Sequence, residues 1–293
     1  MQTFVTQVIS GLSTGGIYAS IALALVLIYQ STGLVNFAQG EMAMFTTYMA
    51  WSMLNAGWGY WPAFVGACLF AFALGFGLER LVIRPLETAP ELALVIVTIG
   101  LLTIFNSVAG WIYTYTIKPF PSPFPAAPIK VGFMVLNPQD LGVVGVTLLM
   151  LALIYLFFHS TRLGLAMRAV VENPVSSRLV GIRVSWMLAL GWGMAAVVGA
   201  VAGLMVAPLV FLEPNMMGGV LIYAFASATL GGFSSAGGAV VGGFVMGILE
   251  NLTGTYITLV GTKLKLTVAL AVIVLVLLIK PTGLFGRAAV RRV

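Results

Sequence analysis

Charged residues are scarce in this chain of 293 residues, of which 8% are charged and 60% are hydrophobic. An ordinary soluble domain has roughly 25% charged residues, and a soluble fold could not hide this much apolar surface from water. A transmembrane helix needs about 20 mostly apolar residues to cross the hydrocarbon core of a bilayer, and such stretches recur from end to end of the sequence. The composition therefore excludes a soluble protein and indicates an integral membrane protein.

Reactive side chains are also few. The single cysteine, Cys68, lies inside an apolar run, so the sequence offers no disulfide framework and no cysteine-based metal site. The single histidine, His159, has no carboxylate nearby in sequence, and a nucleophile needs a positioned base. The glycine-rich segment Gly231–Gly238 lacks the ending of a Walker nucleotide site. We therefore expect no enzymatic activity, no metal site and no ATP site in this chain.

The formal net charge of +6 does not indicate a nucleic-acid-binding protein, because the basic residues fall in short segments between apolar runs. That distribution is typical of cytoplasmic loops of membrane proteins. We expect three basic segments to be cytoplasmic and no contact with nucleic acid. The three segments contain Arg80 and Arg84; Arg162, Arg168, Arg178 and Arg183; and Lys280, Arg287, Arg291 and Arg292.

Nine apolar runs predict an all-α, polytopic bundle of transmembrane helices that forms a single transmembrane domain over residues 1–293. The runs are too continuous for the strands of a membrane barrel, in which apolar and polar residues alternate. They are Val8–Tyr29, Phe37–Leu54, Trp61–Leu78, Leu92–Tyr113, Leu141–Phe158, Trp186–Phe211, Met217–Leu230, Ala239–Ile257 and Leu266–Ile279.

The order of the runs and basic segments predicts a topology. Two runs separate the first two basic segments and four separate the second from the third, so all three can lie on one side. The proline-rich stretch 114–140 is then an external loop. If every run spans, the N-terminus is outside. If Met217–Leu230 or the region around Asn36 is re-entrant, the number of spans is eight and the N-terminal side reverses, so we expect eight or nine spans.

The first polar cluster inside apolar sequence consists of Asn36, Gln39 and Glu41, between Gly33 and Gly40. Strongly polar side chains within a membrane are costly and are functional candidates by default. Glycines allow irregular backbone, and helices broken at membrane depth occur where the backbone lines a cavity or is buried in protein. The cluster is therefore either part of a substrate pathway or a cytoplasmic turn in which the glutamate starts a helix.

Glu250 and Asn251 form a second cluster, at the end of a glycine-rich apolar run. A glutamate at that place should point to a cavity or a partner helix rather than to lipid, so we count Glu250 and Asn251 among the candidates for the substrate pathway. The alternative is an interfacial carboxylate that merely ends a span. Glycines four residues apart, such as Gly11 and Gly15, or Gly243 and Gly247, predict helix faces that pack closely.

The segment of about 161–185 contains more residues that start or end helices than an ordinary loop does. Asn173 precedes Pro174, a pair that favours a helix start with proline at its first position. Gly181 can end the short helix that follows. The segment, which also holds Arg168, Glu172 and Arg183, is therefore expected to form a helix, a turn and a short helix on the cytoplasmic face.

Motifs along nearly the whole chain resemble one family, the H-type permease of branched-chain amino acid ABC importers. The segments that carry this resemblance are Gly16–Leu23, Leu27–Tyr29, Val35–Glu41, Glu79–Leu86, Thr98–Leu101, Gly164–Ala169, Glu172–Pro174, Leu179–Ile182, Ala207–Pro208, Leu230–Phe233, Gly237–Ala239, Gly247–Glu250 and Lys280–Gly286. Many relatives carry histidine where Gln39 stands, a departure that weakens a proton-linked role for this position.

The resemblance implies a permease subunit of the bacterial inner membrane, embedded in lipid, which pairs with a second, related permease and with two cytoplasmic ATPases that bind ATP. A periplasmic binding protein would deliver the substrate. The resemblance also implies that the segment from Arg168 to Arg183 is the coupling segment that docks on an ATPase. It does not single out one substrate among leucine, isoleucine, valine, other amino acids, amides and urea.

Two other functions remain compatible with the residues alone. An ion-coupled secondary transporter of small polar solutes would need its ion sites among the few intramembrane polar residues, of which Glu41 and Glu250 are the candidates. A structural membrane protein would use only the glycine packing faces.

Overall fold

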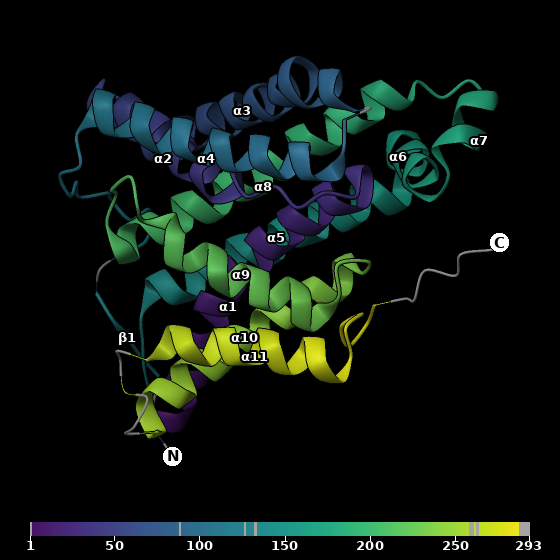
Figure 1. Cartoon of the computed structure of the whole chain (residues 1–293). Helices are drawn as coiled ribbons and strands as arrows, with labels where there is room; N and C mark the ends of the chain where they lie inside the picture. The colour runs from purple at the N-terminus through teal and green to yellow at the C-terminus, as the bar shows by residue number, and fades with distance from the viewer. Residues whose placement is uncertain are drawn as a thin grey trace. The chain divides into compact units, whose positions relative to one another are not determined.

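The computed structural model describes residues 2–87, 89–125, 127–131, 134–257, 261 and 264–286. Arg287, Arg291 and Arg292, expected to be cytoplasmic, lie outside these residues. Every one of the nine apolar runs falls on an α-helix (Figure 1). The nine helices are α1 (Gln2–Thr32), α2 (Gln39–Asn55), α3 (Tyr60–Leu78), α4 (Glu91–Tyr113), α5 (Pro138–Ser160), α8 (Val184–Val210), α9 (Met217–Gly231), α10 (Ala236–Tyr256) and α11 (Lys265–Ile279).

The remaining elements are short. A π-helical turn, η1 (Glu79–Ile83), and a 3-10 turn, η2 (Arg84–Leu86), extend α3. Strands β1 (Ile129–Val131) and β2 (Met134–Leu136) pair antiparallel in the expected external loop. Helices α6 (Arg162–Glu172) and α7 (Pro174–Leu179) make up the helix pair expected between the fifth and sixth apolar runs.

Six of the helices are long and apolar enough to cross a membrane, namely α1, α3, α4, α5, α8 and α10. Two shorter apolar helices, α9 and α11, bring the number to eight. The expected all-α membrane bundle of about eight spans is therefore confirmed. The remaining apolar run corresponds to α2, which has 17 residues and carries Glu41 in its first turn.

The described chain divides into two compact units, and α1, α5 and α9 contribute residues to both. The first unit comprises Met1–Val26, Ser122–Gly145 and Gly218–Val293; the second comprises Leu27–Pro121 and Val146–Met217. The single permease domain expected over residues 1–293 stays a prediction.

Helix α8 is the centre of the second unit, where it packs against α2 and α3 while α2 also contacts α4 (Figure 1). Ala63, Ala67, Ala71 and Gly75 lie four residues apart on the buried face of α3. Small residues at this spacing let helix backbones approach closely. A Cβ added at Gly75 would lie 2.5 Å from the carbonyl oxygen of Trp192 in α8, so the contact between α3 and α8 leaves no room for a side chain there.

In the first unit, α1 packs antiparallel on α10 through glycines of both helices. A Cβ at Gly11 would lie 2.8 Å from Cα of Ile248, and one at Gly15 would lie 2.8 Å from Cα of Phe244. The glycine packing face expected for α1 is thus present.

Candidate functional site

The connection between α1 and α2 is irregular and buried. Helix α1 ends at Thr32, and Gly33 follows with a φ of +72°, a left-handed conformation that glycine adopts without strain. The side-chain oxygen of Asn36 accepts a hydrogen bond of 3.0 Å from the backbone N–H of Ala38, and α2 begins at Gln39. Asn36 and Gln39 have no solvent-exposed surface. The expected irregular backbone is present, and it is buried in protein rather than displayed in a turn.

Gln39 joins this connection to the middle of α8. Its Nε2 donates a hydrogen bond of 3.0 Å to the carbonyl oxygen of Ala195. Ala195 lies eleven residues after Val184, where α8 begins, which is about 16 Å along a helix that rises 1.5 Å per residue. Gly199, one turn further along α8, faces the Gln39 amide. The start of α2 therefore lies well inside the second unit, at the depth of the middle of α8.

Glu41 is 7% exposed and faces α4 rather than α8. Its nearest amide partner is Asn106, whose Nδ2 lies 3.5 Å from a carboxylate oxygen of Glu41. Asn106 also donates to the carbonyl oxygen of Pro214 at 3.0 Å and to the side-chain oxygen of Asn215 at 3.1 Å, and it accepts from the hydroxyl of Tyr115 at 3.2 Å. One amide therefore links α2, α4 and the connection between α8 and α9.

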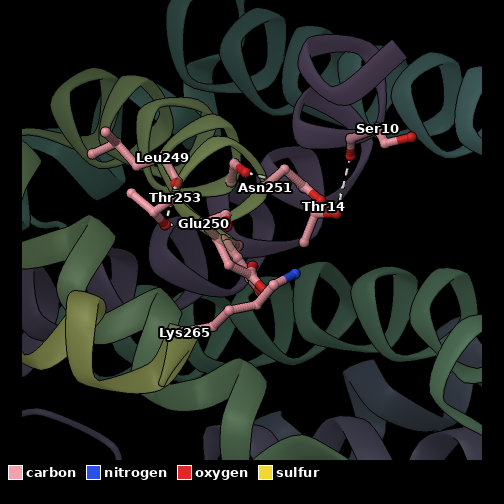
Figure 2. A network of polar contacts seen from close by, with 9 residues as sticks. Ser10, Thr14, Leu249, Glu250, Asn251, Thr253 and Lys265 are labelled. Carbon is pink, nitrogen blue, oxygen red and sulfur yellow. Dashed lines mark hydrogen bonds and ion pairs between the residues drawn. The ribbon is translucent and has the colours of Figure 1, made fainter. Parts of the chain in front are cut away.

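The second predicted cluster belongs to the first unit, where Glu250 contacts two other helices (Figure 2). The hydroxyl of Tyr18 in α1 donates to a Glu250 carboxylate oxygen at 2.5 Å, and Lys265 Nζ of α11 lies 3.7 Å from the other oxygen. The Tyr18 ring stacks on Tyr223 of α9 with centroids 4.7 Å apart. Glu250 therefore points to partner helices, as the sequence predicted, and not to lipid.

Asn251 lies beside Glu250 but bonds differently. Its Nδ2 contacts the Thr14 hydroxyl at 3.4 Å and the Gly247 carbonyl oxygen of its own helix at 3.1 Å (Figure 2). The structure thus brings Asn36, Gln39 and Glu41 together in one unit and Glu250 and Asn251 together in the other.

The helix pair α6 and α7 has the helix-starting and helix-ending residues that the sequence predicted. The Asn173 side chain accepts a hydrogen bond of 2.9 Å from the backbone N–H of Ser176, Pro174 is the first residue of α7, and Gly181 has a φ of +83°. Arg168, Glu172 and Arg183 are exposed. Ser177 is 3% exposed, so α7 packs through this residue and shows its other side chains to solvent.

Comparison with known proteins decides the family. A family model described as "Branched-chain amino acid transport system / permease component" matches residues 7–277. The chain belongs to this family. The permease is 31% identical to the "High-affinity branched-chain amino acid transport system permease protein LivH" of Escherichia coli, over 99% of this chain and 98% of that protein. It is 29% identical to the protein of Pseudomonas aeruginosa named BraD, with the same coverage.

Similarity extends to an archaeon and to a solved structure. A protein of Methanocaldococcus jannaschii named as a probable branched-chain amino acid transport permease is 29% identical over 91% of the permease and 87% of that protein. The structure of PsaBC from Streptococcus pneumoniae in complex with Fab superposes with a TM-score of 0.51 at 13% identity, covering 96% of the permease and 93% of that chain. At this identity the likeness concerns the fold alone.

Family membership confirms the coarse expectations from sequence. The permease is a component of a branched-chain amino acid ABC transport system, not an enzyme, and it is a multi-pass membrane protein with relatives in the bacterial inner membrane. Among the described residues, no group of three or more His, Cys, Asp or Glu side chains could hold a metal ion.

Sequence reasoning missed Asn106, Tyr18 and Lys265, the partners of the predicted glutamates. Asn106 stands in the apolar helix α4, so the rule that intramembrane polar residues are candidates could have found it. Tyr18 and Lys265 carry no such signal, because tyrosine and a lysine at a helix end are ordinary in membrane proteins.

Proposed function

We propose that the permease forms part of the membrane pathway of an ATP-driven importer for branched-chain or related amino acids. A second, related permease would complete that pathway, two cytoplasmic ATPases would drive it, and a periplasmic binding protein would deliver the substrate to the inner membrane. The observation that carries this proposal is the family match over residues 7–277, with relatives named for branched-chain amino acids that align with nearly the whole chain.

The break before α2 supports a place for the substrate pathway. Asn36, Gln39 and Glu41 are buried polar residues at the depth of the middle of α8, where an exposed polar group would be costly. Broken backbone at this depth is tolerated where it lines a cavity or is buried in protein. On this proposal the substrate passes close to Asn36, Gln39, Glu41 and the newly found Asn106. Glu250 and Asn251 act on transport through helix packing.

The helix pair α6 and α7 supports a contact with an ATPase. It precedes α8 directly, and α6 packs on α8. The segment presents exposed Arg168, Glu172, Asn173, Pro174, Gly181 and Arg183. On this proposal, a movement of the ATPase would displace the helix pair. That displacement would reach α8 through its contact with α6, and Gln39 through its hydrogen bond to α8.

The ion-coupled alternative has little support in the structure. Its two candidate ion sites, Glu41 and Glu250, already have partners within the chain, Asn106 for the first and Tyr18 and Lys265 for the second. A ligand shifts an alternating-access equilibrium only by its differential affinity for the two states. Uphill import through this chain therefore needs an external energy source.

Reconstitution into proteoliposomes tests the proposal. Vesicles that hold the permease alone should accumulate no leucine, isoleucine or valine under a proton or sodium gradient. Adding the second permease, both ATPases, the binding protein and ATP should produce accumulation. Accumulation by the isolated permease under an ion gradient would contradict the proposal, and so would failure of the complete assembly to import any of the amino acids, amides or urea.

A further inference from the structure

A depression of about 520 Å³ lies in the second unit between the turn η2 and the start of α8, on the face expected to be cytoplasmic. Arg84 and Glu87 contribute from the region of η2, Arg178 comes from α7, and Arg183 and Trp186 come from the start of α8. Three arginines from separate elements thus surround one hollow. Gly181 and Arg183 also belong to the segment proposed above to contact an ATPase, but that proposal assigns no ligand to the hollow.

The charges around the depression do not cancel. Arg178 forms an ion pair of 3.6 Å with Glu87, and both side chains are more than half exposed. Glu79, the other nearby carboxylate, is 2% exposed and so is buried beneath the surface. Arg84 and Arg183 line the hollow, and Arg80 lies beside it, so four arginines face two glutamates with an excess of two positive charges. An anionic group entering the hollow would be attracted.

The surroundings of the depression have the character of a membrane interface. The Arg80 guanidinium stacks over the ring of Trp186, 4.1 Å from its centroid, and lies 5.0 Å from that of Phe76. Trp186 is 41% exposed, and Leu81 of η1 is 80% exposed. Tryptophan is enriched at the level of lipid headgroups, and basic pockets on the cytoplasmic side of transmembrane helices bind anionic headgroups. The hollow is therefore placed where a lipid headgroup can enter beside Trp186.

We propose that this depression binds the phosphate headgroup of an anionic phospholipid of the cytoplasmic leaflet, held by Arg84, Arg178 and Arg183. Guanidinium groups suit this task because their planar donors bind phosphate oxygens two at a time. The bound lipid would join the end of α3 to the start of α8 and the α7 connection. An acidic protein segment would not need the exposed Trp186 at the hollow, so an anionic lipid explains more of the features of this surface.

Native mass spectrometry of the full-length permease, purified without ATPases from vesicles of mixed phosphatidylglycerol and phosphatidylcholine, tests the proposal. The unmodified permease should retain phosphatidylglycerol in preference to phosphatidylcholine. Arg84→Gln and Arg183→Gln, separately and together, should lower that retention at least fivefold. Arg162→Gln is the matched control, because it removes the same charge from the cytoplasmic face outside the depression. Arg84→Lys should retain an intermediate amount, because it keeps the charge but loses the planar donors.

Brominated phospholipids supply a second measurement. Brominated phosphatidylglycerol should quench fluorescence more strongly than brominated phosphatidylcholine, and Trp186→Phe should abolish most of the difference. Inorganic phosphate at millimolar concentration should not displace the lipid if the acyl chains contribute to binding. Equal retention of both lipids, an equal loss in Arg162→Gln, or full displacement by free phosphate would overturn the proposal. Since the ATPases are absent, a negative result here would leave the importer proposal standing.

Discussion

The side-chain amide of Gln39 is hydrogen-bonded to the backbone carbonyl of Ala195, 156 positions away in the sequence. Gln39 is the first residue of α2, and Ala195 lies in the middle of α8. The bond holds the start of a helix at the depth of another helix's centre, which requires that the chain return into the protein after α1. That geometry is possible only because α2 and α8 pack closely against each other.

The contact between α2 and α8 depends on glycine at position 203. A Cβ there would lie 2.7 Å from the Thr47 hydroxyl and 2.9 Å from the Ala43 carbonyl oxygen. Gly203→Ala should therefore destabilise the permease by about 1–3 kcal/mol, the usual cost of overpacking a filled core. Gly100→Ala is the control, because a Cβ at Gly100 meets no atom within 4 Å. Thermal unfolding in detergent compares the two, and equal melting temperatures would contradict the packing described.

Asn106→Ala should harm both stability and transport. The change removes the amide beside Glu41 and three further hydrogen bonds, and a buried polar group left without its partner costs about 1–3 kcal/mol. Thr103→Ala, on the same helix, is the control, because its exposed hydroxyl donates to the carbonyl oxygen of Ile99 one turn earlier in α4. Leucine uptake by the reconstituted assembly and thermal unfolding are the measurements. Normal uptake in Asn106→Ala would remove this residue from the proposed pathway.

The Tyr18 and Glu250 side chains should be energetically coupled. Tyr18→Phe, Glu250→Gln and the double variant form a thermodynamic cycle, and directly bonded pairs show coupling of about 0.5–3 kcal/mol. Tyr256→Phe, which changes an exposed tyrosine at the end of α10, should have almost no effect and no coupling. Strictly additive effects of Tyr18→Phe and Glu250→Gln on the free energy of unfolding would show that the hydrogen bond contributes nothing.

Cysteines in α7 distinguish exposed from buried positions of the proposed ATPase contact. The background is Cys68→Ala, which removes the only native cysteine. Ser176→Cys, at an exposed position, should crosslink to the ATPase, whereas Ser177→Cys, at a residue that is 3% exposed, should not. Crosslinks from the neighbourhood of Arg84 and Glu87 in place of Ser176 would move the docking surface to the end of α3.

Local sequence was sufficient to predict the helix pair α6 and α7. The geometry of Asn173, Pro174 and Gly181 follows from short-range rules, because a cap bonds within three residues and a left-handed glycine needs no distant partner. For the same reason, all nine apolar runs coincide with helices. The pattern of small residues likewise predicted which face of α1 packs, although not which helix it meets.

The sequence by itself determined that this chain is a membrane protein, which segments are helical, and where Asn36, Gln39, Glu41 and Glu250 stand as rare polar groups in apolar surroundings. These properties depend on composition and on contacts within a few residues. Only the tertiary structure decided that Gln39 meets α8, that Glu41 meets Asn106, and that Glu250 meets Tyr18. Each pair joins different helices, and helix–helix pairing in a bilayer depends on the fit of whole surfaces, which no single position in the sequence encodes.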